Sequence, residues 1–276
     1  LCSDYNNDGI IDIVVGELTH SYDTEYRDRS AFLTGTTHSF PPKFLRTEYY
    51  TDTGNGAWDQ GDRRGVFFDY DMDGLIDLLV DNSGFPPKSR LILFRQEENH
   101  AFVDLSEKMG VNILNPSGTI TIDINKDGQM DFITGQTTIR NSAIDSKLYV
   151  FINKVIRDRK RSIRFHLKGD LANLQGLGAM IKLQTNKRKM MKWNETLSGP
   201  LPSQNEAGVY FGFDEDKAQS VEVRWPILYK DSKTPLVRTY DLRKYRLKKH
   251  YELTLCESGA VIEGIEDCSK KIELIK

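Results

Sequence analysis

Oxygen-bearing side chains recur in a nine-residue pattern that occurs three times in this chain. The copies begin at Asp4, Asp69 and Asp123 and read Asp-x-Asp/Asn-x-Asp-Gly-x-x-Asp. Positions 1, 3, 5 and 9 carry side-chain oxygens and position 7 offers a backbone carbonyl, so each loop can wrap around a hard cation. The glycine at position 6 permits a sharp turn that a residue with a Cβ resists.

This donor set predicts Ca²⁺ in a structural role. No Cys or His recurs in register, which removes zinc, and Mg²⁺ fits less well because it retains its waters and prefers a strict octahedron. An EF-hand would need Glu at position 12, where the copies have Val15, Val80 and Thr134. The predicted ligands are Asp4, Asn6, Asp8, Ile10 and Asp12; Asp69, Asp71, Asp73, Leu75 and Asp77; and Asp123, Asn125, Asp127, Gln129 and Asp131.

The second loop carries four carboxylates, whereas the other two carry three carboxylates and an asparagine. On charge alone, we expect the second loop to bind Ca²⁺ most tightly. Catalysis at the loops is not expected, because no nucleophile or general base accompanies them in the sequence.

The segments around the loops favour β-structure. Residues 66–68 and 119–122 precede the second and third loops, residues 13–15 and 78–80 follow the first and second, and all are apolar or β-branched. Strand–loop–strand units of this kind predict an all-β fold. We expect a partial β-propeller with about three blades in residues 1–155, a small β-sandwich or barrel in 162–256, and a C-terminal appendage in 257–276.

Composition narrows the function further. The chain has 38 Lys and Arg against 40 Asp and Glu, a net charge of −2, so we expect no nucleic-acid partner. No apolar run approaches the roughly 18 residues of a membrane span.

Because the first residue is Leu1 and a motif follows at once, we expect a truncation or processing point there. Cys256 and Cys268 could pair across a short loop, or all three cysteines could be unpaired.

Several short sequence segments, or phrases, resemble those of a known family. The loops resemble the FG-GAP or VCBS repeats of integrin alpha-chain propellers, and the second half resembles the ASPIC/UnbV domain, an order found in the cartilage acidic protein group and its bacterial relatives. The phrases are residues 91–95, 102–105, 110–111, 177–183, 203–206, 210–213 and 221–226. The resemblance implies a protein that is extracellular, on the cell surface or in the bacterial periplasm, with no well-established reaction. It departs in one respect, since integrin-type propellers have seven blades.

Three functions remain open from the sequence. The first is a calcium-stabilised binding or adhesion module that contacts a protein or glycan. The second is a metal-dependent enzyme with a site in the insertion at 17–58, built from His20, Tyr22, Asp23, Glu25, Asp28 and His38. The third places recognition in the basic stretch 187–192 with Trp193, which would meet an acidic polysaccharide or anionic surface.

Overall fold

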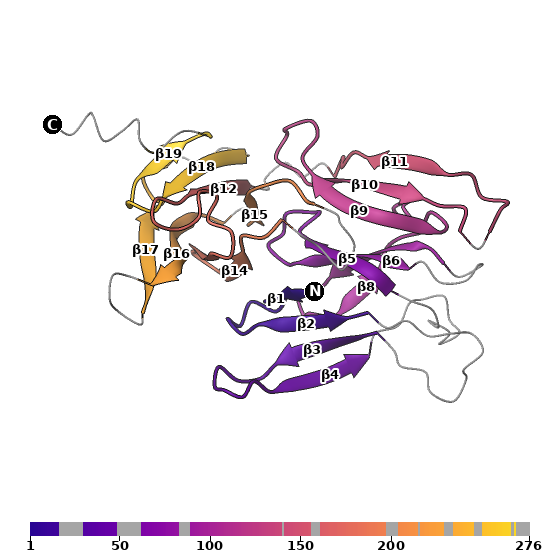
Figure 1. Cartoon of the computed structure of the whole chain (residues 1–276), viewed down its shortest axis with the longest axis horizontal. Coiled ribbons are helices and arrows are strands. Elements are labelled where there is room, and N and C mark those ends of the chain that lie inside the picture. The colour runs from indigo at the N-terminus through magenta and orange to yellow at the C-terminus, as the bar shows by residue number, and fades with distance from the viewer. Residues whose placement is uncertain are drawn as a thin grey trace.

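The computed structural model describes residues 1–16, 30–48, 62–82, 89–139, 141–155, 161–196, 204–214, 216–228, 234–245, 250–265 and 268. These residues contain nineteen strands and no helical element. The strands assemble into five separate sheets. Figure 1 shows three sheets from the first part of the chain on one side and the C-terminal strands on the other.

Residues 1–155 form three antiparallel sheets. Their strand orders are β1-β2-β3-β4, β5-β6-β7-β8 and β11-β10-β9. In each sheet the first strand lies at an edge and pairs with the second, so the three carboxylate-rich loops connect equivalent strands. The strands are β1 (Cys2–Ser3), β2 (Asp12–Val15), β3 (Ala31–Gly35), β4 (Phe44–Glu48), β5 (Asp62–Phe68), β6 (Asp77–Asn82), β7 (Leu91–Gln96), β8 (Phe102–Asp104), β9 (Pro116–Ile122), β10 (Asp131–Gln136) and β11 (Lys147–Phe151).

Two apolar clusters join these three sheets. Phe32 of the first sheet packs in a buried cluster with Phe94 of the second. On the other face of the second sheet, Phe68 meets Phe132 of the third, with ring centroids 6.4 Å apart. Blade-sized sheets packed face to face in chain order are the arrangement of a propeller.

The C-terminal strands form two four-stranded sheets over one core. Their orders are β14-β13-β16-β17 and β15-β12-β18-β19, and β12 and β18 run parallel. Both sheets bury apolar side chains in a single cluster that includes Phe165, Phe211 and Trp225. The strands are β12 (Ser162–Lys168), β13 (Met180–Thr185), β14 (Lys189–Trp193), β15 (Val209–Gly212), β16 (Ala218–Leu228), β17 (Pro235–Asp241), β18 (His250–Cys256) and β19 (Val261–Glu263).

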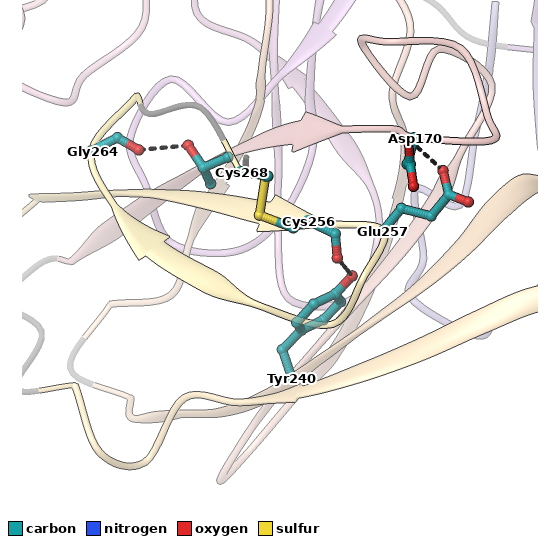
Figure 2. Close-up of a disulfide and its surroundings, with 7 residues drawn as sticks. Asp170, Tyr240, Cys256, Glu257, Gly264 and Cys268 are labelled. Atoms are coloured by element: carbon teal, nitrogen blue, oxygen red, sulfur yellow. Dashed lines mark hydrogen bonds between the residues drawn. A yellow bond between two sulfur atoms is a disulfide. The ribbon is translucent and has the colours of Figure 1, made fainter. Parts of the chain in front are cut away.

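A disulfide closes the edge of this C-terminal domain. Cys256, at the end of β18, is bonded to Cys268, with Cα atoms 6.0 Å apart. Figure 2 shows the Tyr240 hydroxyl donating to the Cys256 carbonyl oxygen, at 2.7 Å, beside this bond. The next residue, Glu257, is buried, and its carboxylate accepts the backbone N–H of Asp170 at 2.7 Å. Cys2 is a free, exposed thiol.

The all-β prediction with a propeller arrangement is confirmed, with three differences. Five sheets are present instead of about three blades, because the C-terminal strands form two further sheets of blade size. The insertion at 17–58 contains β3 and β4, which complete the first sheet through ladders that its polar sequence conceals. Residues 257–276 are not wholly an appendage, since β19 pairs with β18 and Cys268 is tied back.

Candidate metal centre

The three carboxylate-rich loops share one backbone conformation. Loop 1 (residues 4–12), loop 2 (69–77) and loop 3 (123–131) each have a left-handed residue at position 4, with φ of 58°, 56° and 57° at Asn7, Met72 and Lys126. The glycine at position 6 has φ of 86°, 86° and 85°. This conformation is unfavourable for residues with a Cβ, which explains why position 6 is a glycine in each copy.

The first carboxylate of each loop organises the turn. Asp69 accepts the backbone N–H of Asp73 at 3.1 Å through one oxygen and that of Gly74 at 2.9 Å through the other. Asp4 and Asp123 make the same two bonds to positions 5 and 6 of their loops. The turn therefore wraps around a carboxylate that is already fixed in orientation.

The last carboxylate ties the loop to its sheet. Asp77 accepts the N–H of Tyr70 at 3.0 Å and, through its second oxygen, the N–H of Gln96 at 2.9 Å. Asp12 and Asp131 make equivalent bonds, including 2.8 Å from Gly35 and 2.7 Å from Asn153. Position 9 thus anchors the loop to the third strand of the first two sheets and, in the third sheet, to the residues just past β11.

Three side-chain carboxylates converge in loop 2. Asp69, Asp71 and Asp77 are all buried, and one oxygen from each lies within 4.8 Å of the others. In loops 1 and 3 an asparagine, Asn6 or Asn125, stands in place of Asp71. The backbone N–H groups of the position-7 residues Ile10, Leu75 and Gln129 donate to the position-5 carboxylates at 2.7, 2.9 and 2.8 Å.

Burial makes these carboxylates unfavourable as bare anions. Desolvation, with smaller contributions from neighbouring carboxylates, raises the pKa of Asp4 and Asp69 to about 7. The same causes raise the pKa of Asp77 well above its usual value. A hard cation among these oxygens would offset both the desolvation and the mutual repulsion. The chemistry of the donor set therefore fits Ca²⁺, and the predicted residues would supply its ligands.

Loop 2 differs from the other loops in its counter-charge. Arg95 of β7 donates to Asp71 at 2.9 Å and to Asp73 at 2.8 Å. In loops 1 and 3 the position-5 carboxylate instead accepts a hydrogen bond from the side-chain amide of Asn6 or Asn125, at 2.9 Å in each case. Four carboxylates and one guanidinium leave loop 2 with the same formal charge, −3, as three carboxylates leave its neighbours. Arg95 thus removes the charge argument for tighter binding at loop 2.

The C-terminal domain contributes a second cation near loop 2. The Lys192 ammonium donates to the Tyr210 carbonyl oxygen at 2.7 Å, and both residues line, with Asp69, a cavity of about 120 Å³ at the domain junction. Burial lowers the pKa of Lys192, an effect that the nearby Asp69 and Asp77 oppose. The sequence does not predict that Arg95 or Lys192 supplies a counter-charge to loop 2. The signal it offers is Asp71 at position 3, where the other two loops have asparagine, because a fourth carboxylate calls for a compensating cation.

The residues of the enzyme hypothesis do not form a site within the described part of the chain. His38 lies exposed in the turn between β3 and β4, while His20, Tyr22, Asp23, Glu25 and Asp28 lie outside the described residues. A Ser–His contact occurs elsewhere, between Ser162 Oγ and His250 Nδ1 at 2.7 Å. Ser162 is buried and donates to the Gly128 carbonyl oxygen, so its hydroxyl is structural.

The basic stretch 187–192 is largely engaged within the protein. Lys187 pairs with Asp216 at 3.2 Å, and Arg188 pairs with Glu98 at 2.6 Å. Met190 and Met191 are buried, because this stretch contains strand β14 of the C-terminal domain. These contacts leave fewer free charges for a polyanion than the sequence suggested.

The fold and the loops define an all-β protein with a propeller arrangement and a separate C-terminal domain. A family model described as ASPIC and UnbV matches residues 169–243, which lie within that C-terminal domain. No curated protein matches the chain. Among the residues that the structure describes, none belongs to a helix long and apolar enough to cross a membrane.

Proposed function

We propose that this chain is an extracytoplasmic calcium-binding protein of the FG-GAP or VCBS type, related to the cartilage acidic protein group, in which Ca²⁺ in the three loops is structural. The observation that carries the proposal is the threefold repetition of one loop geometry. Each copy has the same two left-handed positions, and its first and last carboxylates accept the same backbone hydrogen bonds. Ordinary Asp-Gly turns at a surface would not be expected to repeat the same arrangement of buried, hydrogen-bonded carboxylates three times.

Two further observations support this function. The Asp69, Asp71 and Asp77 oxygens converge as ligands of one cation would. The Cys256–Cys268 disulfide favours an oxidising location, which is the extracellular space, the cell surface or the bacterial periplasm. An ordered sheet scaffold of this kind, with calcium as part of its folding, suits a module that binds a protein or glycan.

Calcium titration calorimetry with loop variants tests the metal assignment. Asp12→Asn, Asp77→Asn and Asp131→Asn each remove the last carboxylate of one loop, and each is expected to abolish one of the binding sites of the full chain. Asp145→Asn is the matched control, because Asp145 is exposed and its ion pair among the described residues is with Lys147 at 3.3 Å. The proposal is wrong if the wild-type chain binds no Ca²⁺ at millimolar concentration.

The binding role has a separate test. Phe40 and Leu45, at the β3–β4 hairpin, are 93% and 61% exposed, more apolar surface than folding requires there. A panel of immobilised glycans and extracellular proteins should include a ligand that binds with Ca²⁺ and is released by a chelator. Replacing Phe40 by Ser should weaken that binding without affecting Ca²⁺ uptake. If no glycan and no extracellular protein of the panel retains the chain, the result would argue against an adhesion module.

A further inference from the structure

The C-terminal domain is bonded directly to the first ligand residue of loop 3. The Glu206 carboxylate accepts the backbone N–H of Asp123 at 2.8 Å. Two residues earlier, the Thr121 N–H donates to the Asn205 side-chain oxygen at 3.0 Å, and the Glu206 N–H donates to the Thr121 carbonyl oxygen at 3.0 Å. The other Glu206 oxygen pairs with Arg164 at 2.7 Å. Glu206 therefore links the metal loop to a charged group of the C-terminal domain.

The C-terminal domain makes its second contact with Gly128, the turn glycine of loop 3. Its carbonyl oxygen accepts the Ser162 hydroxyl at 3.0 Å, and that hydroxyl contacts His250. A Cβ placed on Gly128 would lie 2.2 Å from the His250 ring, so the C-terminal domain packs against the backbone of the turn. This contact depends on the left-handed conformation that the loop adopts.

Loop 2 is covered by the same domain. The Asp214 N–H donates to the Met72 carbonyl oxygen at 3.2 Å. Gly212 lies so close to loop 2 that a Cβ on it would be 2.3 Å from an Asp69 carboxylate oxygen. By contrast, loop 1 makes no hydrogen bond to the C-terminal domain among the described residues, and its Asn7 reaches only loop 2, at 3.4 Å.

The hydrogen bonds from Glu206, Ser162 and Asp214 are made with the backbone of loops 2 and 3, whose shape the carboxylates determine. Without a cation, carboxylates a few ångströms apart repel one another, which favours opening of the loops. Resting on the proposed calcium binding, we infer that calcium occupancy of loops 2 and 3 and docking of the C-terminal domain form one linked equilibrium. Calcium holds the docking surface in shape, and by reciprocity docking tightens calcium binding at these two loops but not at loop 1.

Hydrogen exchange of the wild-type chain tests the first half of this linkage. On chelation, amides of residues 204–212 are expected to lose protection together with those of loops 2 and 3. The amides of β18, which lie in the core of the C-terminal domain, should keep theirs. Protection that is unchanged at 204–212 while the loops exchange freely would overturn the inference.

The variant Glu206→Gln tests the reciprocal half, because Glu206 is not a predicted ligand. We expect it to weaken calcium binding at loop 3 by about five- to tenfold and to leave loop 1 unchanged. Glu263→Gln is the matched control, because Glu263 is an exposed residue at the end of β19. Terbium luminescence in an Asp12→Asn, Asp77→Asn background isolates loop 3, and an Asp77→Asn, Asp131→Asn background isolates loop 1.

The outcomes separate the two proposals. Wild-type affinity at loop 3 in the Glu206→Gln variant would overturn the linkage and leave calcium binding intact. A wild-type chain that takes up no calcium would refute the proposed function itself. If the multiple variants fail to fold, the exchange experiment on the wild-type chain decides the question.

Discussion

The two halves of the molecule are stabilised by different chemistry. The C-terminal domain buries one continuous apolar core between its two sheets and adds a disulfide at its edge. The three N-terminal sheets share two smaller apolar clusters and bury many carboxylates in their loops. Apolar burial is favourable by itself, whereas buried carboxylates are favourable only when hydrogen-bonded and neutralised. A reductant and a chelator should therefore act on different halves.

Replacing Trp225 tests the apolar side of this comparison and has the largest expected effect. Trp225 is only 1% exposed in the C-terminal core. The variant Trp225→Ala should lower the free energy of unfolding by roughly 3–5 kcal/mol, from lost burial and the cavity left behind. Urea unfolding should give the same intrinsic loss for the C-terminal transition at saturating calcium and in chelator. A loss that appears only without calcium would break the distinction between the halves.

Removing the disulfide should have the next largest effect. The bond joins residues 12 positions apart, and a closed loop of that size contributes about 3 kcal/mol by restricting the unfolded chain. Cys268→Ser should therefore destabilise the C-terminal transition. Cys2→Ser is the control, since Cys2 is exposed and unpaired. Equal melting temperatures for Cys268→Ser and the wild type under oxidising conditions would contradict this account.

Removing Arg95 tests the charged side. Its partners Asp71 and Asp73 are buried or nearly so, while Arg95 itself is 23% exposed. Arg95→Gln should lower the free energy of unfolding by about 2 kcal/mol in chelator, a value reduced from that of a fully buried pair. The loss should shrink in calcium, because the cation then balances the carboxylates. Arg243→Gln, which breaks an exposed pair with Asp241, should change nothing measurable.

An alanine at the loop glycines should have the smallest effect and compares loop 1 with loop 3. Gly9 and Gly128 have the same left-handed φ. A Cβ on Gly9 comes no nearer than 3.8 Å to His38, whereas one on Gly128 meets His250 at 2.2 Å. Gly9→Ala should cost about 1 kcal/mol from backbone strain and Gly128→Ala about 2 kcal/mol, because the latter also disturbs docking. Thermal unfolding that shows equal losses would argue that loop 3 does not carry the C-terminal domain.

Local features of the fold were predictable from sequence because they depend on adjacent residues. The periodic oxygens and the glycine at position 6 identify a turn with side chains directed inward. The continuous apolar run at residues 91–94 indicates the buried strand β7, to which these residues belong. In contrast, β3 and β4 are short and lie in a polar segment, so the sequence offers little signal for them. The sequence of strand β14 indicates a basic stretch instead of a buried strand, since its two buried methionines lie between lysines.

The interactions between distant residues could not be predicted. Arg95 follows loop 2 by about twenty residues, and Glu206 lies 83 residues from Asp123. Such partners are selected by tertiary packing, which a single sequence does not reveal. The expected ranking of loop affinities rests on carboxylate number alone and stays a prediction. It does not include the counter-charge that Arg95 brings from another strand.

Thermal unfolding of the full chain with and without a chelator, paired with metal analysis, tests the central claim most directly. At a calcium concentration one hundred times the dissociation constant, each occupied site contributes about 2.7 kcal/mol. Chelation should therefore lower the melting temperature of the N-terminal sheets by several degrees, and Ca²⁺ but not Mg²⁺ should restore it. A chain that contains no calcium and melts at the same temperature in chelator would contradict the account.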